Sequence, residues 1–289
     1  MKQPLFTGTC TALVTPFLNG QVNYPMAEQL LKRQIDAGIK AVVVAGTTGE
    51  GATLTDAEKI ELVHRSKQYA SDHCQIIAGT GSNATSKAIE LSQKAEKAGA
   101  DALLVVSPYY NKTTPDGLIA HYSAIASAVE IPIIVYNVPG RTGIDIPVEV
   151  YQQLSGIPNI IGAKEASSCI SKISKILNAC TRDFYVWTGN DDMILPSVAL
   201  GAQGVISVVS NVLPVQTTAL TQAALCNDLS SARQLHNKLL PLMELLFCEV
   251  NPIPVKEAMR LIGFDCGECR LPLVQMTMAN RAKLSRILT

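Results

Sequence analysis

The sequence predicts an α/β protein: a (β/α)8 TIM barrel followed by a C-terminal all-helical extension. Three observations lead to this fold class. Short apolar segments rich in Val and Ile recur up to residue 208, segments with helical spacing separate them, and only helical segments follow the last of them. Because such a barrel takes roughly 250 residues, the 289 residues of the chain leave room for an extension.

Eight apolar segments are the predicted strands. They do not alternate apolar with polar residues, which is typical of parallel strands covered on both faces. An open doubly wound sheet usually has fewer strands and a Gly-rich first turn, so the number of segments favours the closed barrel. The segments are residues 8–14, 41–45, 75–78, 102–106, 133–136, 160–163, 185–187 and 204–208.

Helical segments lie between the first five of these strands, and the ends of these segments carry recognisable signals. Gly38 and Gly99 close two of them, a Thr55-x-x-Glu58 capping box opens a third, and Pro115 suits the first turn of a fourth. The segments are residues 26–37, 56–70, 87–98 and 118–129.

Beyond the eighth strand only helices are predicted. They cover residues 213–226, 229–249, 255–262 and 273–288. We expect Pro241 to kink or split the second of them, since proline lacks the N–H that a helix interior requires. The predicted units are a catalytic barrel domain at residues 1–224 and a C-terminal helical domain at residues 225–289.

Composition and charge exclude several classes of function. With 47% hydrophobic and 17% charged residues, the bulk of the chain is not disordered. The 24 basic and 24 acidic side chains form no long run of one sign, so no nucleic-acid partner is expected. No apolar run approaches the roughly 20 residues that cross a membrane, and residues 1–8 show no secretory signal. A cytoplasmic protein is therefore predicted.

The eight cysteines do not indicate a disulfide scaffold in a chain of this size. Several, such as Cys169, Cys180 and Cys226, lie in apolar contexts, and we expect reduced thiols packed as small hydrophobic residues. Cys266 and Cys269 form a CxxC, but no second pair or His cluster completes a zinc site. No metal site is predicted.

In this fold the active site is built at the carboxyl ends of the strands. The segments there are GTTGE at residues 46–50, SPYYN at 107–111, YNVPGRTG at 136–143 and KE at 164–165. Lys164 ends the sixth strand, where its side chain should point into the mouth of the barrel.

A lysine in that position suggests covalent chemistry. Burial disfavours the ammonium form of a lysine, and the neutral amine is a nucleophile. Attack on a carbonyl gives a Schiff base, which turns the adjacent carbon into an enamine nucleophile without a metal or organic cofactor. The alternative is a structural Lys164 paired with a buried carboxylate, such as that of Glu165.

Hydroxyl groups and one guanidinium complete the candidate site. Tyr136, Tyr110, Thr47 and Thr48 could relay protons if they lie within hydrogen-bond reach of one another. The alternative for each tyrosine is a half-buried ring with its hydroxyl in water. Arg141, in the turn beyond the mouth, could grip a carboxylate through two parallel hydrogen bonds, or form only a surface ion pair.

Together these four ordered segments resemble the dihydrodipicolinate synthase family of pyruvate-dependent class I aldolases, and the resemblance covers nearly the whole chain. It implies an enzyme that condenses pyruvate with L-aspartate 4-semialdehyde to 4-hydroxy-tetrahydrodipicolinate, in the diaminopimelate route of lysine biosynthesis. It also implies a homotetramer built as a dimer of tight dimers.

The resemblance assigns a role to each site residue. Lys164 would form the Schiff base, and Tyr136 would be the proton donor and acceptor. Thr47 and Tyr110 would complete a proton relay, with Tyr110 supplied by the neighbouring subunit. The residues that would bind substrate are Thr48 for the pyruvate carboxylate, Arg141 for that of the aldehyde, and Gly189 and Ile206 as lining.

Other functions remain as alternatives. N-acetylneuraminate lyase and sugar-acid aldolases share the lysine and the tyrosine, but a cationic Arg141 suits a short substrate with a free carboxylate better than a polyhydroxylated one. The Thr47-Thr48 pair also favours the synthase. The chain has no basic patch that would support a non-catalytic keto-acid sensor. Its residues 189–192 and 210–212 contain no Gly-rich phosphate cradle, which argues against a sugar-phosphate isomerase.

One group of residues departs from the family pattern. Members inhibited by lysine carry a glutamate at the position of Lys87, where it holds the ammonium of the inhibitor. A like charge there should repel lysine, with Lys59 adding to the repulsion and Asp56 offsetting part of it. We therefore expect weak lysine inhibition or none. The residues of this vestigial regulatory pocket are Ala52, Leu54, Asp56, Lys59, Asn83, Lys87 and Tyr109.

Overall fold

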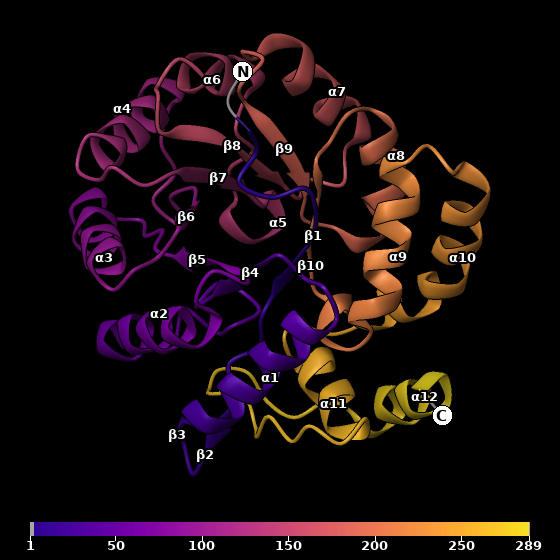
Figure 1. Cartoon of the computed structure of the whole chain (residues 1–289). Coiled ribbons are helices and arrows are strands. Elements are labelled where there is room, and N and C mark those ends of the chain that lie inside the picture. The colour runs from indigo at the N-terminus through magenta and orange to yellow at the C-terminus, as the bar shows by residue number, and fades with distance from the viewer. Residues whose placement is uncertain (1–2, 289) are drawn as a thin grey trace.

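The computed structural model describes residues 3–288 and shows a closed parallel barrel. Each predicted strand is present, and its ends lie within two residues of the predicted ones. The strands follow one another around the barrel in chain order, and β1 closes the ring by pairing with both β4 and β10 (Figure 1). They are β1 (Gly8–Ala12), β4 (Ala41–Val44), β5 (Gln75–Gly79), β6 (Ala102–Val106), β7 (Ile133–Asn137), β8 (Ile160–Glu165), β9 (Tyr185–Thr188) and β10 (Gly204–Ser207).

Helices surround the strands, as predicted. The expected capping box at Thr55 is formed, since Glu58 N donates to Thr55 Oγ1 at 3.2 Å and Thr55 N donates to Glu58 Oε2 at 2.8 Å. The helices are α1 (Tyr24–Asp36), α2 (Asp56–Ala70), α3 (Thr85–Lys97), α4 (Pro115–Ala126), α5 (Pro139–Thr142), α6 (Val148–Leu154), α7 (Ile170–Ala179), α8 (Ile194–Ala199) and α9 (Pro214–Leu225). A short hairpin, β2 (Phe17–Leu18) with β3 (Gln21–Val22), was not predicted because two-residue strands carry no periodicity.

The apolar core has two layers. One fills the space between the strands and the helices, and the other fills the inside of the barrel. Before β1, the ring of Phe6 stacks on Trp187 with 4.9 Å between centroids, and the Trp187 indole N–H donates to the carbonyl of Phe6 at 3.2 Å. Because these side chains fill the barrel from its amino-terminal end, a substrate can reach the interior only from the carboxyl ends of the strands.

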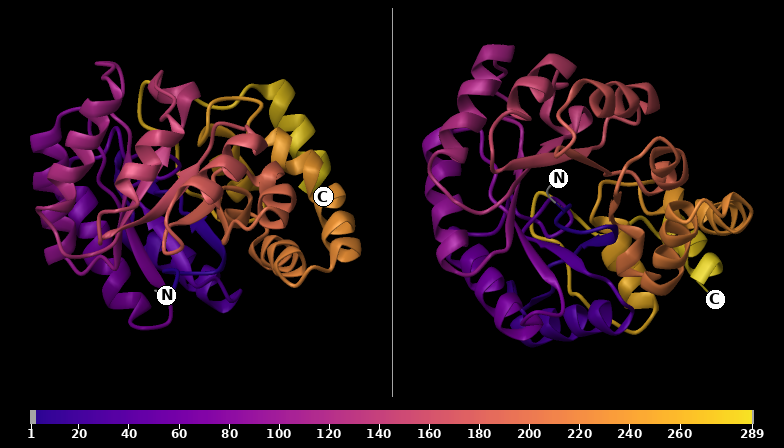
Figure 2. Two further views of the ribbon diagram at one scale, coloured as in Figure 1. Left: turned by 90° about the horizontal axis from the view of Figure 1, so that it is seen from above. Right: turned by 45° about the horizontal axis from the view of Figure 1, so that its top comes forward.

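The extension consists of α10 (Leu229–Leu245), α11 (Ile253–Leu261) and α12 (Met278–Leu288), which gather on one side of the barrel beyond α8 and α9 (Figure 2). The expected split at Pro241 is wrong, since α10 runs through it, and the helix ends at Leu245 rather than at residue 249. Pro241 and Asn237 are both exposed, so water can bond the carbonyl that the proline leaves without an N–H. The division of the chain after residue 224 stays a prediction.

The last predicted helix is wrong in its first part, because α12 begins only at Met278. Before it, tertiary hydrogen bonds hold the backbone in an irregular path. Arg270 N donates to Glu50 Oε2 at 2.8 Å, and Thr277 N donates to Glu249 Oε1 at 3.1 Å. The bond from Thr277 lies within the predicted helix and competes there with the helical spacing of the apolar residues, whereas Arg270 precedes that helix.

An ion pair fixes this irregular segment to α2. The guanidinium of Arg270 donates to both carboxylate oxygens of Glu58, at 2.5 and 2.8 Å, and to the carbonyl of Thr53 at 3.0 Å. The hydrogen bond from Arg270 lowers the pKa of Glu58 from 4.5 to about 2. Both side chains are largely buried, so solvent screens this interaction only in part.

This pKa predicts a pH dependence of stability. A carboxylate whose pKa is lower in the folded than in the unfolded chain stabilises the fold fully above the unfolded pKa, and the contribution is lost as the pH falls toward the folded one. We expect Glu58→Gln to cost roughly 2 kcal/mol more at pH 6 than at pH 3, relative to wild type. Urea unfolding at both pH values measures this, and an equal cost at both would contradict it.

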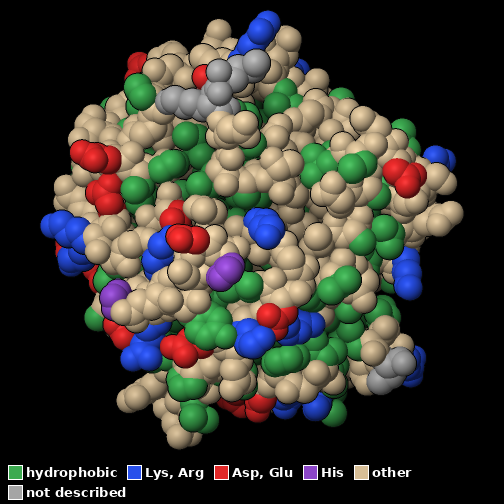
Figure 3. Space-filling model, viewed as in Figure 1, with side chains coloured by type: hydrophobic (Ala, Val, Ile, Leu, Met, Phe, Trp, Pro, Cys, Tyr) green, Lys and Arg blue, Asp and Glu red, His purple; other side chains and the backbone are tan. Residues whose placement is uncertain are grey.

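The distribution of charges on the surface agrees with the prediction from the sequence, but the exposure of several cysteines does not. On the face shown in Figure 3, basic and acidic side chains are interspersed. No helix within residues 3–288 is long and apolar enough to cross a membrane. The expectation that residues 1–8 contain no secretory signal falls partly on residues 1 and 2, which lie outside the described residues. All eight cysteines are free, but Cys169, Cys226 and Cys248 are exposed, so the expectation that Cys169 and Cys226 pack as small hydrophobic residues is wrong. Cys169 and Cys226 lie at helix caps, where side chains face water.

Candidate active site

Two predicted catalytic side chains meet at the carboxyl ends of β7 and β8. Tyr136 and Lys164 pair across these neighbouring strands and both point into the barrel. Lys164 Nζ lies 4.3 Å from the centroid of the Tyr136 ring, and the two residues are only 5% and 6% exposed. The amine and the tyrosine are therefore placed together in a site from which water is largely excluded.

A bulge in β8 gives Lys164 this direction. The register of β8 against β7 shifts by one residue between Ile133 and Ile134, so that Tyr136 lies level with Lys164. Ile160 belongs to the outer layer of the core, whereas Lys164, four positions later, points inward. In a regular strand these two side chains would share one face, so the extra residue is what turns the lysine into the barrel.

The structural alternative, a pair between Lys164 and Glu165, is wrong. Glu165 points away from the barrel interior and accepts hydrogen bonds from Asn137 Nδ2, Tyr151 Oη and Ser167 N, each at 2.9 Å. Among residues 3–288, no carboxylate forms an ion pair with Lys164. The buried amine thus lacks the partner that a structural lysine would be expected to have.

Gly189 adjoins the lysine, and Ile206 lies inside the barrel. A Cβ atom on Gly189 would lie 2.8 Å from Lys164 Cε and 2.8 Å from Ala166 Cβ, so only glycine leaves room for the lysine side chain here. Ile206 is fully buried on β10 and belongs to the same interior cluster as Tyr136. Gly189 therefore borders the lysine side chain, and Ile206 shares the interior cluster with Tyr136.

The loop after β4 carries Thr47 and Thr48 in a tight path. A Cβ on Gly51 would come within 2.2 Å of the carbonyl of Ala45, which explains the glycine. Ala45 and Glu50 both have φ of 54°, a left-handed backbone that is unusual outside glycine and that collects at functional sites. Thr48 is 2% exposed, so its hydroxyl is held rigidly.

Asn251 joins two of the predicted binding residues and was missed. Its Nδ2 donates to Thr48 Oγ1 at 3.0 Å, and its carbonyl accepts from Arg141 Nη2 at 3.1 Å. No strand end carries this residue, because Asn251 precedes α11 in the extension. The sequence shows only an Asn-Pro dipeptide, which predicts a turn.

Arg141 and Tyr110 are the two exposed members of the predicted site. Arg141 lies in the one-turn helix α5 rather than in an open turn. Tyr110 is 92% exposed, and its hydroxyl bonds to no described residue of its own chain. One chain therefore brings together Lys164 with Tyr136, and Thr48 with Arg141, but does not bring Tyr110 to them.

In the predicted regulatory pocket Lys87 and Asp56 are already paired with each other. Lys87 forms ion pairs with Asp56 and, at 3.3 Å, with Glu90. The hydrogen bond from Lys87 lowers the pKa of Asp56, and burial lowers the pKa of Lys59. The remaining members are Ala52 and Tyr109, which are exposed, Leu54, which is buried, and Asn83, whose carbonyl accepts from Asn111 Nδ2 at 2.9 Å.

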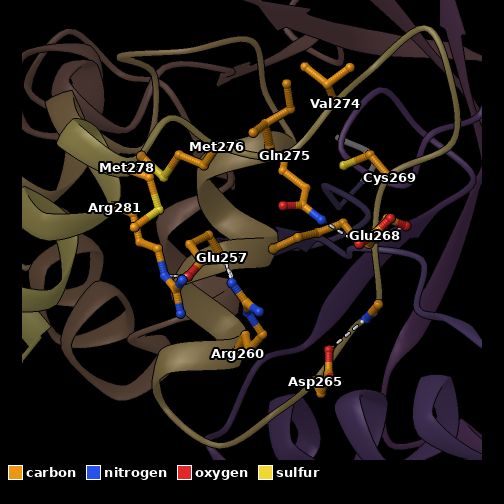
Figure 4. A pocket seen from close by; sticks show the side chains of 13 residues that line it. Glu257, Arg260, Asp265, Glu268, Cys269, Val274, Gln275, Met276, Met278 and Arg281 are labelled. Atoms are coloured by element: carbon orange, nitrogen blue, oxygen red, sulfur yellow. Dashed lines mark hydrogen bonds and ion pairs between the residues drawn. The ribbon is translucent and has the colours of Figure 1, made fainter.

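A separate cavity of about 210 Å³ lies within the extension (Figure 4). Its walls come from α11, α12 and the irregular segment between them, and Glu257 there forms ion pairs with Arg260 and, at 2.7 Å, with Arg281. Burial raises the pKa of the Cys269 thiol, which lines it, to about 12. None of the predicted site residues within residues 3–288 lines this cavity.

The fold and the site define a (β/α)8 barrel protein with a buried, unpaired lysine facing a tyrosine at the strand ends. A family model described as "Dihydrodipicolinate synthetase family" matches residues 5–289, and the chain belongs to this family.

Similar proteins agree over the full length. The chain is 48% identical over 285 residues to the 4-hydroxy-tetrahydrodipicolinate synthase of Fervidobacterium nodosum, covering 98% of each. It is 40% identical to the dihydrodipicolinate synthase of Acinetobacter baumannii, solved in complex with pyruvate, with a TM-score of 0.96 and 98% of each chain covered. It is also 40% identical to the enzyme of Cyanidioschyzon merolae, solved with lysine bound, with a TM-score of 0.94 and coverage of 98% and 97%.

Proposed function

We propose that the chain condenses pyruvate with L-aspartate 4-semialdehyde to 4-hydroxy-tetrahydrodipicolinate, in the diaminopimelate route of lysine biosynthesis. The observation that carries this proposal is the buried Lys164, which forms no ion pair with any described carboxylate and lies with its Nζ 4.3 Å from the centroid of the Tyr136 ring. Membership of the family and the activity named for its relatives support it.

In this proposal Lys164 is the nucleophile. Its neutral amine attacks the carbonyl carbon of pyruvate, water leaves, and an imine forms. Loss of a methyl proton then gives an enamine, whose carbon attacks the aldehyde of the second substrate. The amine of that substrate displaces Lys164 from the imine carbon, which closes the ring and frees the enzyme. Tyr136 transfers the protons, and the scheme requires no metal or organic cofactor.

Thr48 and Arg141 bind the two carboxylates in this proposal, that of pyruvate and that of the aldehyde respectively. A structural neighbour solved with pyruvate supports the first substrate. Gly189 and Ile206 line the space around the amine. Thr47 and Tyr110 complete the proton relay, and the 92% exposure of Tyr110 suits delivery into a neighbouring subunit. We also propose a homotetramer assembled from tight dimers, and the cytoplasmic location stays a prediction.

The test is the substrate dependence of pyruvate consumption. We expect the purified chain to consume pyruvate only when L-aspartate 4-semialdehyde is present, with formation of the cyclic product. The alternative is a lyase of the same scaffold, which would instead release pyruvate from N-acetylneuraminate or a sugar acid. Release of pyruvate from those compounds, without condensation of the semialdehyde, would overturn the proposal.

We further propose that lysine inhibits this enzyme weakly or not at all. A structural neighbour binds lysine, but here Lys87 pairs with Asp56, so the carboxylate that could attract the ammonium of a ligand is already neutralised. We expect initial rates to be essentially unchanged by about 1 mM lysine. Half-inhibition well below that concentration, in a coupled assay, would contradict this. Lys87→Glu removes the repelling cation and is the variant in which inhibition should increase.

A further inference from the structure

We propose that Asn251, from the C-terminal extension, is a positioning residue that aligns Thr48 and Arg141 for the two substrate carboxylates. The inference rests on the proposed function, which assigns those carboxylates to the two residues. It makes the extension part of the binding site rather than an appendage of the barrel.

The side-chain amide of Asn251 sets the direction of the Thr48 hydroxyl. Asn251 Nδ2 donates to Thr48 Oγ1 at 3.0 Å, so the hydroxyl oxygen is the acceptor in this bond. The hydroxyl proton must then point elsewhere, which leaves Thr48 as a donor. A donor of fixed direction is what a bound carboxylate requires.

The backbone of the same residue holds the guanidinium of Arg141. Arg141 Nη2 donates to the carbonyl of Asn251 at 3.1 Å. Arg141 is exposed on the short helix α5, where a long side chain would otherwise sample many rotamers. The bond uses one of its five N–H groups and orients the guanidinium plane, while the others can still bind a carboxylate.

The surroundings of Asn251 indicate a functional role. It is only 5% exposed, and its Oδ1 is buried without a hydrogen-bond partner among the described residues. An unpaired buried oxygen is unfavourable for stability, so the amide is not explained as a stabilising contact alone. A second contact from the extension, Lys256 Nζ to Glu50 Oε1 at 2.9 Å, anchors the same loop that carries Thr48.

The test uses pyruvate alone and measures the concentration that half-saturates the adduct trapped by borohydride. We expect Asn251→Ala to raise this concentration about 3- to 10-fold, the effect of one lost hydrogen bond. In a Thr48→Val background the same substitution should add no more than about twofold, because the hydroxyl it orients is gone. In steady-state assays, Asn251→Ala should raise KM for pyruvate more than it lowers kcat, whereas KM for the aldehyde should change less, because the carbonyl that accepts from Arg141 belongs to the backbone and is kept. The control is Asn237→Ala, an exposed asparagine of α10 in the same extension.

Each outcome decides between the two proposals. Absence of an adduct in the wild-type chain would overturn the proposed function itself. An adduct with the same half-saturation in wild type and Asn251→Ala, or an equal loss in the Thr48→Val background, would overturn the role of Asn251 alone. If Asn251→Ala does not fold, Asn251→Asp keeps the shape but makes the Thr48 hydroxyl the donor. Unchanged pyruvate saturation in that variant would also overturn the role.

Discussion

Lys164→Ala is expected to lower kcat at least about 1,000-fold, because in the proposed mechanism every bond-forming step passes through an adduct on this amine. After incubation with pyruvate and borohydride, the wild-type chain should gain one reduced pyruvyl group, and peptide mapping should place it on Lys164. The variant should gain none. Intact-mass measurement reads this directly and needs no second substrate.

The structure predicts that this variant still folds. Lys164 forms no ion pair with residues 3–288. The buried Asp191, whose pKa burial raises and the charge of the lysine lowers in part, keeps the hydrogen bonds from Val208 N and Val209 N when the lysine is removed. Lys175→Ala, at an exposed position of α7, is the matched control and should keep both the adduct and the activity. A melting temperature near that of wild type would confirm folding. An adduct retained in Lys164→Ala, or full activity, would show that another amine is the nucleophile.

The barrel was predictable because its strands are continuous apolar segments, but the direction of its key side chain was not fixed by that pattern. Counting alternate residues from Ile160 places Lys164 on the outer face of β8, and only the bulge reverses this. A bulge is a single extra residue without a sequence signal of its own. The inward direction of the Lys164 side chain was nevertheless predicted correctly, because that prediction used the position of the residue at the end of a strand, and strand ends in this fold face the mouth of the barrel.

The extension was the less predictable part. The hydrogen bond between Asn251 and Thr48 joins residues 203 positions apart, a separation that local patterns do not record. The helical spacing after residue 273 was overruled in its first part by the hydrogen bond from Thr277 N to Glu249. Local propensity is a weak signal wherever tertiary contacts with distant charged groups decide the backbone path.

Lys256→Met is expected to destabilise the fold by roughly 3–5 kcal/mol, because it leaves Glu50 as a buried charge without its cation. The two side chains are 3% and 1% exposed and lie 2.9 Å apart. Lys256 Nζ also donates to the carbonyl of Glu268 at 3.1 Å and lies 4.4 Å from the centroid of the Phe17 ring. The substitution therefore breaks two contacts between the extension and the barrel, with Glu50 and Phe17, and one within the extension.

Urea unfolding at pH 7 and one fixed protein concentration measures this cost, since self-association would shift the apparent stability. Lys238→Met, at an exposed position of α10, is the control for adding the same side chain. The double variant Glu50→Gln with Lys256→Met should recover part of the loss, because no unpaired charge stays buried. Glu50 lies in the loop that carries Thr48, so the single variant should also bind pyruvate more weakly even where it is folded. A cost below about 1 kcal/mol would show that solvent or another cation reaches Glu50, and that the extension does not anchor this loop through the ion pair.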